Sequence, residues 1–588
     1  MTCEATVVFQ LSTGRRALPV KQAKVTVTDS YKKTEVTEYT GEEGKTKPIH
    51  TETPSKELAM SPFAATKPYS IYHAYVEAEG YFPITIHGLQ MFEGTVSIVE
   101  LNMTPLPINK GVRKERYEVE EHSLRCARER KKDMKNNRIN LRVHSYNCLA
   151  YVHIPAVITV HLGEPDDHSA KNLTVSFLDY IKNVACSELY PTWPLEALEA
   201  NIYVQVTLAL HRLYTGWYSS KGYDFDITNQ AAYDQTYVAG RNIYENISQI
   251  VDRQFDFYIR EKESCVPLFP EYGNTSLKEN KGLSKWGSVS LAQQGYSPIE
   301  ILKVYYGDQI EIAQTNIVEE MASPYPGFIL EQGSISPSVE TLERSINRIH
   351  RNYPAIPMII EMDYRFTSET QWAVSEFQKM FFLEETGKAD AGTWNRIAFM
   401  ASAILRLQDL NQEGQMQPIP SIPPSVLLRL GSRGGYVRLA QYFIKVIACF
   451  YEDIRMVDID GVFGKRTRAA VLDVQKRFEL SPDAIIGPLT WDQLYNGYLG
   501  IAISIGIVIP YPGYLVRRGT RGENVYLMQE YLKTISKRLN VPDIDIDGIF
   551  GPGMEASVMA FQELFGLDPD GLIGKQTWER IVSIRRLI

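Results

Sequence analysis

At the start of the chain, apolar and polar positions alternate in short runs. The runs at 5–11, 23–28 and 96–101 place apolar side chains at every second position and are separated by turn-rich stretches. A period of two residues is that of a strand with one buried face. The pattern predicts an antiparallel β-sandwich over residues 1–106, and no set of catalytic side chains occurs in it.

The C-terminal part of the chain has the period of helices, and its pattern occurs three times. Each copy ends in a Thr-Trp pair and has a Gln 16 residues before the Trp. The Gln and Trp pairs are Gln378 and Trp394, Gln475 and Trp491, and Gln562 and Trp578. One spacing kept in three copies indicates a repeated structural unit.

The sequence between these positions predicts the structure of the repeat. Asp-Gly-x-Phe-Gly at 460–464 and 547–551 is typical of a turn, because glycine takes positive φ angles without strain. A helix with apolar residues at i, i+3, i+4 and i+7 follows. We expect Thr490 and Thr577 to cap a closing helix that buries its Trp. The pattern predicts three-helix bundles over residues 326–410, 426–498 and 499–588.

The order of these motifs resembles the peptidoglycan-binding module of cell-wall hydrolases. The second and third copies match it nearly throughout. The first copy departs from it, with Asp363-Tyr-Arg-Phe in place of Asp-Gly-x-Phe-Gly and Asp390 in place of a turn glycine. The resemblance implies peptidoglycan as the partner. The alternative is that the repeats are only spacers.

The segment 151–325 is patterned differently. An apolar-periodic stretch ends in Glu188, and Pro194 precedes a long amphipathic helix expected from Leu195 to about Tyr218, at a position where helices commonly begin. We expect a central mixed α/β domain here. The protein as a whole is then a multidomain α+β chain.

Five motifs of this segment occur in a characteristic order. They are DYIKNVACSE (179–188), WPLEAL (193–198), GYDFDIT (222–228), GLSKWG (282–287) and IEILKVYYGD (299–308). This order resembles the stage II sporulation protein D domain. In the N-terminal domain, PYSIY (68–72) and VEAEGYFP (76–83) resemble the transthyretin-like or carboxypeptidase-regulatory sandwich. Nearly the whole chain resembles the clostridial spore cortex-lytic enzymes. The resemblance implies a lytic transglycosylase that cleaves between N-acetylmuramic acid and N-acetylglucosamine with a 1,6-anhydro product.

The resemblance also places the catalytic carboxyl group on Glu188. Such a group protonates the glycosidic oxygen and then assists attack by the muramoyl 6-hydroxyl. Tyr190 and Trp193 are candidate substrate-binding residues, because their rings can stack on sugars and desolvate the carboxyl group. The alternative is a solvated Glu188 at a helix end. Lys285 and Trp286 are further substrate-binding candidates, although Lys285 replaces a polar neutral residue of the relatives, which points to altered glycan preference or a weakened enzyme.

Two segments between the domains are predicted to be linkers. Residues 107–150 are rich in Lys and Arg and poor in large apolar residues, which is typical of a charged linker. The relatives are precursors activated by a subtilisin-like protease. Residues 107–150 are therefore also the candidate processing region, and residues 1–106 a candidate pro-region. Residues 411–425 are proline-rich and predict a semi-rigid spacer.

Charge and cysteine content narrow the functional classes. A net charge of -8 argues against nucleic acid as a partner. The six cysteines lie far apart without a CxxC pair, so we expect no metal and no cofactor. The most apolar window, 499–510, is too short to span a bilayer, and the N-terminus lacks an ordinary secretion signal. We expect no membrane partner.

The expected function is that of a spore cortex lytic transglycosylase that acts in germination and is made as a precursor. The expected location is the spore, and the alternative is the cytoplasm. The competing function is a catalytically inactive peptidoglycan-binding or spore structural protein. A zinc-dependent amidase is not expected, because we expect no His-x-x-Glu or His-x-His pattern suited to zinc-assisted amide hydrolysis among the ten histidines.

Overall fold

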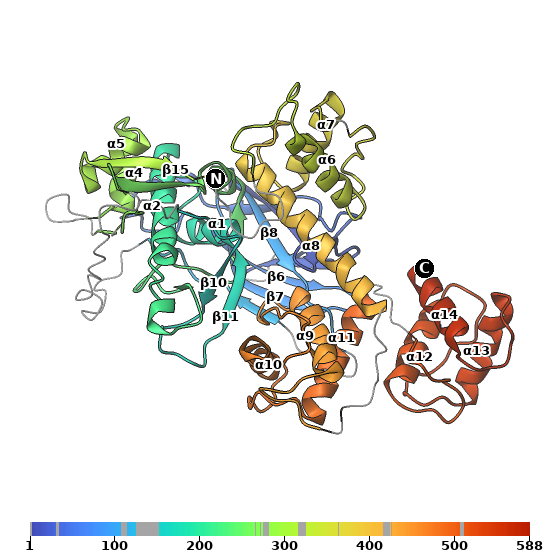
Figure 1. The fold of residues 1–588 in the computed structure, drawn as a ribbon. Coiled ribbons are helices and arrows are strands. Elements are labelled where there is room, and N and C mark those ends of the chain that lie inside the picture. The colour runs from blue at the N-terminus through green and yellow to red at the C-terminus, as the bar shows by residue number, and fades with distance from the viewer. Residues whose placement is uncertain are drawn as a thin grey trace. The chain divides into compact units, whose positions relative to one another are not determined.

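The computed structural model in Figure 1 folds into two compact units. The first unit comprises residues 1–103 and 113–404, and the second comprises residues 104–112 and 405–588. The structure describes residues 3–30, 35–107, 115–124, 152–264, 266–270, 272–273, 282–315, 325–362, 364–415, 424, 426–505 and 511–587. Most of the predicted linkers 107–150 and 411–425 therefore lie outside the described residues.

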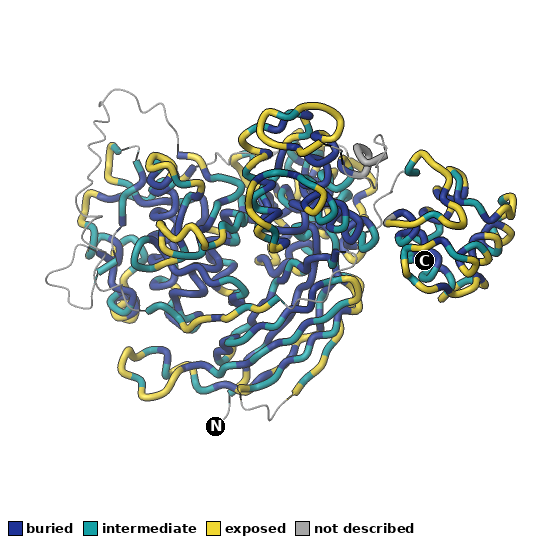
Figure 2. The backbone as a smooth tube through the Cα atoms, turned by 90° about the horizontal axis from the view of Figure 1, so that it is seen from below, coloured by how far each residue is buried: buried dark blue, intermediate teal, exposed yellow. Residues whose placement is uncertain are grey.

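The N-terminal part of the first unit is a β-sandwich. Its strands are β1 (Cys3–Thr13), β2 (Leu18–Pro19), β3 (Lys24–Asp29), β4 (Glu35–Tyr39), β5 (Ile49–Thr53), β6 (Ser70–Glu77), β7 (Ile84–Met91), β8 (Val96–Asn102) and β9 (Glu115–Glu118), with the short helix η1 (Lys56–Met60) after β5. One sheet has the order β4-β3-β6-β7-β9, and the other has β13-β8-β1-β2 with β5 paired to β1. Figure 2 shows buried and less buried residues alternating along these strands.

The prediction of an antiparallel sandwich is wrong for two pairs of strands. β1 pairs with β8 in parallel, and β7 pairs with β9 in parallel. The chain crosses to the opposite sheet for β3 and β4, comes back for β5, and crosses again for β6 and β7 before β8 pairs with β1, so strands distant in sequence become neighbours. Alternating side chains of both sheets, among them Phe9, Val25 and Ile86, form one buried core, as the period of two predicts.

The central part of the first unit is mixed, as predicted. Its helices are α1 (Phe177–Glu188), α2 (Leu195–Tyr214), η3 (Ser219–Lys221), α3 (Glu245–Gln254), α4 (Lys285–Gln293) and α5 (Pro298–Tyr306). Its strands are β10 (Val157–His161), β11 (Asn172–Ser176), β12 (Ile227–Thr228), β14 (Phe257–Glu261) and β15 (Ile310–Gln314), while β13 (Ile243–Tyr244) joins the sandwich. α2 is buried along most of its length, which explains why it is apolar almost all round.

Each of the three repeats contains three helices, as the sequence pattern predicts. They are α6 (Pro337–His350), α7 (Ser368–Met380) and α8 (Ala391–Gln415) in repeat 1, α9 (Gly435–Phe450), α10 (Lys465–Arg477) and α11 (Pro488–Ile505) in repeat 2, and α12 (Glu523–Ser536), α13 (Pro552–Leu564) and α14 (Lys575–Leu587) in repeat 3. Trp491 and Trp578 are fully buried, in agreement with the prediction. Among the described residues, no helix is both long and apolar enough to cross a bilayer.

The predicted capping role of Thr490 and Thr577 is wrong. α11 begins at Pro488 and α14 at Lys575, so both threonines lie inside the first helical turn. The hydroxyl of Thr490 instead accepts a hydrogen bond from Gln475 at 3.2 Å, and that of Thr577 accepts one from Gln562 at 3.2 Å. The threonines therefore tie the closing helix to the helix before it.

Candidate active site

Glu188 is the last residue of α1, a helix that starts with Ser176 as its cap. Its side chain is only 4% exposed, so the alternative of a solvated helix-end residue is not what the structure shows. Oε1 accepts a hydrogen bond from the amide of Thr236 at 2.8 Å. Oε2 accepts one from Nε2 of the fully buried Gln205 at 3.3 Å. The carboxylate is thus held by polar groups inside the domain.

Lys285 forms an ion pair with this carboxylate. It is the first residue of α4, and its Nζ lies 3.1 Å from Oε2 of Glu188, with the lysine side chain 5% exposed. The same ammonium donates to the carbonyl of Ser123 at 2.7 Å and lies 5.0 Å from the ring centre of Tyr272. Lys285 is therefore a direct partner of Glu188, whereas the sequence indicated it only as a substrate-binding candidate.

Residues 119–124, which we call the strap, run from the sandwich across the end of α1. The strap leaves β9 with the amide of Val119 donating to the carbonyl of His87 at 2.7 Å. The amide of Ser123 donates to the carbonyl of Ser187 at 2.9 Å, and Nη2 of Arg241 donates to the carbonyl of Glu120 at 2.5 Å. Backbone groups at both ends of the strap are thus bonded to the central domain beside Glu188.

The side chain of His122 fixes the strap in an aromatic cluster. Its ring centre lies 5.1 Å from that of Tyr190, 5.4 Å from Phe92 and 6.1 Å from Tyr244, against which it stacks. Burial, followed by the positive charges of Arg241 and Lys285, holds the pKa of His122 well below its ordinary value. His122 therefore sits in the cluster as a neutral ring.

The predicted aromatic substrate-binding residues lie together. The ring centre of Trp193 is 5.6 Å from that of Tyr190 and 5.0 Å from that of Trp286. Trp193 is 4% exposed, and its indole N–H donates to the carbonyl of Ala59 in η1 at 2.9 Å. In this conformation the rings pack against the sandwich and the strap, and their role in binding sugar stays a prediction.

The described residues hold no group of three or more His, Cys, Asp or Glu side chains that could bind a metal. The expectation that no His-x-x-Glu pattern occurs is wrong at one place, His161 and Glu164. The Nδ1 of His161 bonds Oδ1 of Asn172 at 2.7 Å, Nε2 bonds the carbonyl of Glu164 at 2.9 Å, and the ring stacks on Phe225. Both ring nitrogens have protein partners, so this spacing serves packing of the domain.

Buried glutamines organise the turns of repeats 2 and 3. Nε2 of Gln475 donates to Oδ1 of Asp483 at 2.8 Å and to the carbonyl of Ile485 at 3.0 Å, and its Oε1 accepts from the amide of Ala484 at 2.9 Å. Equivalent contacts to a turn aspartate are made by Gln441, Gln529 and Gln562. A fully bonded buried amide stabilises its turn. The repeated Gln is a structural residue.

Repeat 1 departs from this arrangement where its sequence does. Gln378 donates to the hydroxyl of Thr386 at 3.1 Å in place of a turn aspartate. Glu343, which is fully buried, accepts from the hydroxyl of Thr370 at 2.7 Å at the position where repeat 2 has Gln441. The carboxylate of Asp390 accepts from the amide of Thr393 at 2.8 Å and so caps α8. Asp363 lies outside the described residues.

Several contacts of the candidate site were not predicted from the sequence. Asn201 and Gln205 are polar residues four positions apart in the apolar α2, and this spacing is the one signal that could have indicated a buried polar site. No sequence pattern indicates the contacts of the strap, because they are made mainly by backbone groups.

Comparison with known families identifies the C-terminal part of the chain. Residues 336–397, 437–494 and 521–581 match the family described as "Putative peptidoglycan binding domain". These segments are peptidoglycan-binding repeats. The match includes the divergent first copy, and it confirms the repeats predicted from the Gln-to-Trp spacing.

Similar proteins cover only parts of the chain. A "Probable N-acetylmuramoyl-L-alanine amidase" of Bacillus licheniformis is 24% identical over 199 residues, 33% of this chain and 55% of that protein. An "Uncharacterized protein in bpoA1 3'region" of Kitasatospora aureofaciens is 49% identical over 37 residues, 6% of this chain and 31% of that protein. The chain thus spans about half or less of the length of these relatives.

A solved structure, that of the SleB N-terminal domain, is similar to a short part of the chain. It is 35% identical, covers 12% of this chain and 93% of its own, and has a TM-score of 0.11. The family match relates the three repeat segments to peptidoglycan-binding proteins.

Proposed function

We propose that the chain is a lytic transglycosylase of spore cortex peptidoglycan, made as a precursor and acting in germination, with its repeats as wall anchors. The observation that supports this proposal is the buried carboxyl group of Glu188, at the end of α1 and beside the cluster of Tyr190, Trp193 and Trp286. A buried carboxyl group next to a specific charge partner is a frequent feature of acid-base sites.

The proposed reaction requires one carboxyl group in two roles. Protonated Glu188 gives its proton to the glycosidic oxygen as the bond from that oxygen to C1 of the muramoyl residue breaks. The resulting carboxylate accepts the proton of the muramoyl 6-hydroxyl, whose oxygen forms the new bond to C1. The products are a 1,6-anhydromuramoyl end and a free 4-hydroxyl on N-acetylglucosamine, and Glu188 is again protonated.

The conformation described here fits the resting state of a precursor. The strap bonds the carbonyl of Ser187 and the ammonium of Lys285, on either side of Glu188. A glycan strand reaches Glu188 only after the strap moves. The candidate processing region continues directly after Leu124, in residues outside the described ones, and a subtilisin-like protease is the proposed activating partner. The proposed location is the spore.

One observation favours the competing function of an inactive wall-binding protein. The ammonium of Lys285 occupies the position, 3.1 Å from Oε2 of Glu188, where a sugar oxygen has to approach. If Lys285 keeps this position after the strap moves, the chain binds peptidoglycan without cleaving it.

Digestion of purified cortex peptidoglycan separates the two functions. A sequence-specific protease site placed within residues 125–151 allows the chain to be cut without removing the sandwich. We expect the cut protein to release anhydromuropeptides, detected by mass, and Glu188→Gln to lower their release about 100-fold to 10,000-fold. Glu199→Gln, a partly buried control on α2, retains activity. Binding without products from any form would support the inactive protein.

The anchoring role is tested by sedimentation with insoluble peptidoglycan. Several weak modules on one chain bind more tightly than one, because the second contact is intramolecular. Deletion of residues 426–588 should therefore reduce the sedimented fraction, whereas Glu188→Gln should leave it unchanged. An unchanged fraction after the deletion would contradict the anchoring role of repeats 2 and 3.

A further inference from the structure

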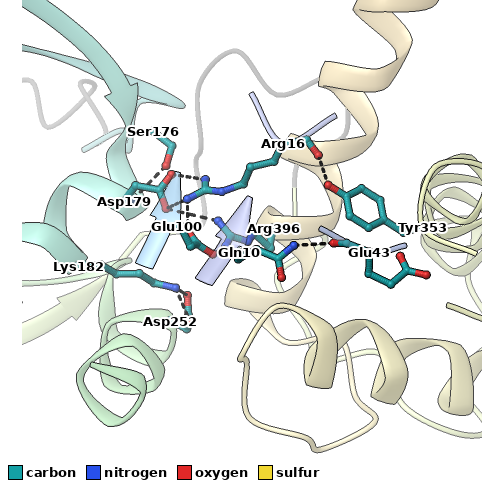
Figure 3. Close-up of polar contacts among 10 residues, drawn as sticks. All are labelled: Gln10, Arg16, Glu43, Glu100, Ser176, Asp179, Lys182, Asp252, Tyr353 and Arg396. Atoms are coloured by element: carbon teal, nitrogen blue, oxygen red, sulfur yellow. Dashed lines mark hydrogen bonds and ion pairs between the residues drawn. The ribbon is translucent and has the colours of Figure 1, made fainter. Parts of the chain in front are cut away.

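The sandwich meets the rest of the first unit at a cluster of four charged side chains. Arg16 and Glu100 come from the sandwich, Asp179 from α1 and Arg396 from α8 (Figure 3). Nη1 of Arg16 lies 2.5 Å from Oδ2 of Asp179, and Nη2 of Arg396 lies 2.6 Å from Oε1 of Glu100. Arg16 also pairs with Glu100, and Arg396 with Asp179 at 3.4 Å. Each carboxylate thus contacts both guanidinium groups.

The cluster is electrically balanced and largely buried. Arg396 is 4% exposed, Arg16 and Glu100 are 18% exposed, and Asp179 is 24% exposed. Burial alone would raise the pKa of Asp179, but the charges of Arg16 and Arg396 outweigh it and hold this pKa below its ordinary value. Removing one member of a buried ion pair is costly, because its partner remains buried and unpaired. Separation of the sandwich would break the two pairs that cross the contact, Arg16 with Asp179 and Arg396 with Glu100, and leave each charge with only one partner.

A shared sheet forms a second contact between the sandwich and the central domain. β13 pairs with β8 in the registers Ile243 with Ile98 and Tyr244 with Ser97. The neighbouring Asn242 donates from Nδ2 to the carbonyl of Gln90 at 2.8 Å. The strand β13 belongs to the chain of the central domain but completes a sheet of the sandwich.

Repeat 1 forms a third contact. The hydroxyl of Tyr353 donates to the carbonyl of Arg16 at 2.9 Å, as Figure 3 shows, and Nδ2 of Asn352 donates to the carbonyl of Ala17 at 2.8 Å. Phe382 packs with Val8 and Ile98 of the sandwich. It follows α7 in a left-handed conformation with φ of 58°.

The other repeats show that Phe382 is specific to this contact. The equivalent left-handed positions are Glu479, with φ of 58°, and Gly566, with φ of 67°. An aromatic side chain is uncommon in this conformation, which costs free energy for residues other than glycine. Burial of the ring against the sandwich offsets that cost in repeat 1.

A fourth contact lies within the second unit, where residues 104–107 pack against repeat 2. The hydroxyl of Tyr451 donates to the carbonyl of Pro105 at 2.8 Å. A Cβ atom at Gly500 would lie 2.0 Å from the carbonyl oxygen of Leu106, so glycine is needed for this close approach. The segment that leaves the sandwich is therefore held as well.

We infer that the sandwich is a permanent subunit, whose binding partner is the remainder of its own chain. Cleavage between Leu124 and Val152 then yields two chains, residues up to the cut and residues after it, that stay together as a 1:1 complex. Such a cut frees the C-terminal side of the strap and leaves the sandwich in place. This inference concerns assembly and does not rest on the proposed catalysis.

The test uses the full chain with the protease site within residues 125–151. After complete cleavage at low micromolar concentration, sedimentation velocity should show one species near the 66.9 kDa of the intact chain. Separate species for the two fragments would overturn the inference. Species heavier than one chain would also overturn it, because a 1:1 complex has a fixed mass.

A matched pair of variants tests whether the ion cluster holds the fragments. Arg396→Met should weaken the cut complex at least about 100-fold, because Glu100 and Asp179 lose a shared partner. Arg580→Met changes the equivalent arginine of repeat 3, which is exposed, and should leave the complex unchanged. Equal affinities of the two variants would overturn the role of the cluster. Circular dichroism of the uncut variants shows whether each is folded.

Discussion

The ammonium of Lys285 lies 3.1 Å from Oε2 of Glu188, and the two side chains are 5% and 4% exposed. Two opposite charges have thus been removed from water together. The pair links the proposed catalytic residue to the strap, because the same ammonium donates to the carbonyl of Ser123. Stability, access to Glu188 and the proposed catalysis are therefore coupled at one lysine.

Replacement of Lys285 alone should destabilise the first unit. Lys285→Met leaves a buried carboxylate without its charge partner, and we expect a loss of about 3–5 kcal/mol in the free energy of unfolding. The double variant Lys285→Met with Glu188→Gln removes both charges and should recover most of this loss. Urea unfolding of the uncut proteins measures both values. Additive losses in the double variant would contradict a direct interaction.

Replacement of Ser123 by proline should weaken the strap. Proline lacks the N–H that donates to the carbonyl of Ser187, and loss of one such bond costs about 1–1.5 kcal/mol, or about tenfold in the open fraction. We expect uncut Ser123→Pro to release about tenfold more anhydromuropeptides than the uncut native chain. The same variant with Glu188→Gln is the control for activity from another source. Equal release from native and variant chains would contradict the strap as the closing element.

Acidification should loosen the strap through His122. Its pKa in the folded state lies well below the ordinary value of 6.5, so a detached strap binds a proton between these values that the seated strap does not bind. Below pH 6.5 the free energy of opening the strap should therefore fall by about 1.4 kcal/mol for each pH unit. Above pH 6.5 this free energy should not depend on His122.

The protection factor of the Ser123 amide in hydrogen exchange, determined at each pH, measures the free energy of strap opening locally. His122→Phe should remove the pH dependence of this free energy, because phenylalanine fills the aromatic cluster without titrating. A local readout is needed because burial also lowers the pKa of His211, to about 4, and this residue adds a similar slope to global unfolding. His211→Gln should leave the exchange profile of Ser123 unchanged. A protection factor of the Ser123 amide that does not change with pH in the native chain would contradict the role of His122.

Loss of the buried glutamine should destabilise its repeat. Gln562→Ala removes the amide that donates to Oδ1 of Asp570 and to the carbonyl of Leu572, for which we expect a loss of about 2–4 kcal/mol in unfolding free energy. Gln576→Ala, at an exposed position of α14, should change stability by less than about 0.5 kcal/mol. Urea unfolding compares the two. Peptidoglycan sedimentation in the absence of urea should be similar for both if Gln562 is structural.

The sequence predicted those features whose cause is local. The Gln-to-Trp spacing predicted the repeats, because Gln475 and Trp491 are both fixed by contacts inside one bundle. The apolar-periodic stretch that ends in Glu188 likewise corresponds to one element, the helix α1. The proximity of Tyr190, Trp193 and Trp286 followed from a family resemblance.

Features built from distant segments could not be predicted. Lys285 follows Glu188 by nearly a hundred residues, and no local pattern indicates that they pair. The charged cluster combines Arg16, Asp179 and Arg396 from three parts of the chain, each of which reads in sequence as an ordinary surface charge. The parallel pairing of β1 with β8 depends in the same way on the path of the whole chain.

The pairing of β8 with β13 has a consequence for synthesis of the protein. β8 emerges from the ribosome early, but β13, which covers its outer edge, follows only after α1 and α2 have been made. Until then the sandwich presents an open strand edge, and such edges pair readily with other chains. A recombinant fragment ending at residue 124 should therefore tend to self-associate, and slower elongation before residue 243 should raise the aggregated fraction of newly made protein.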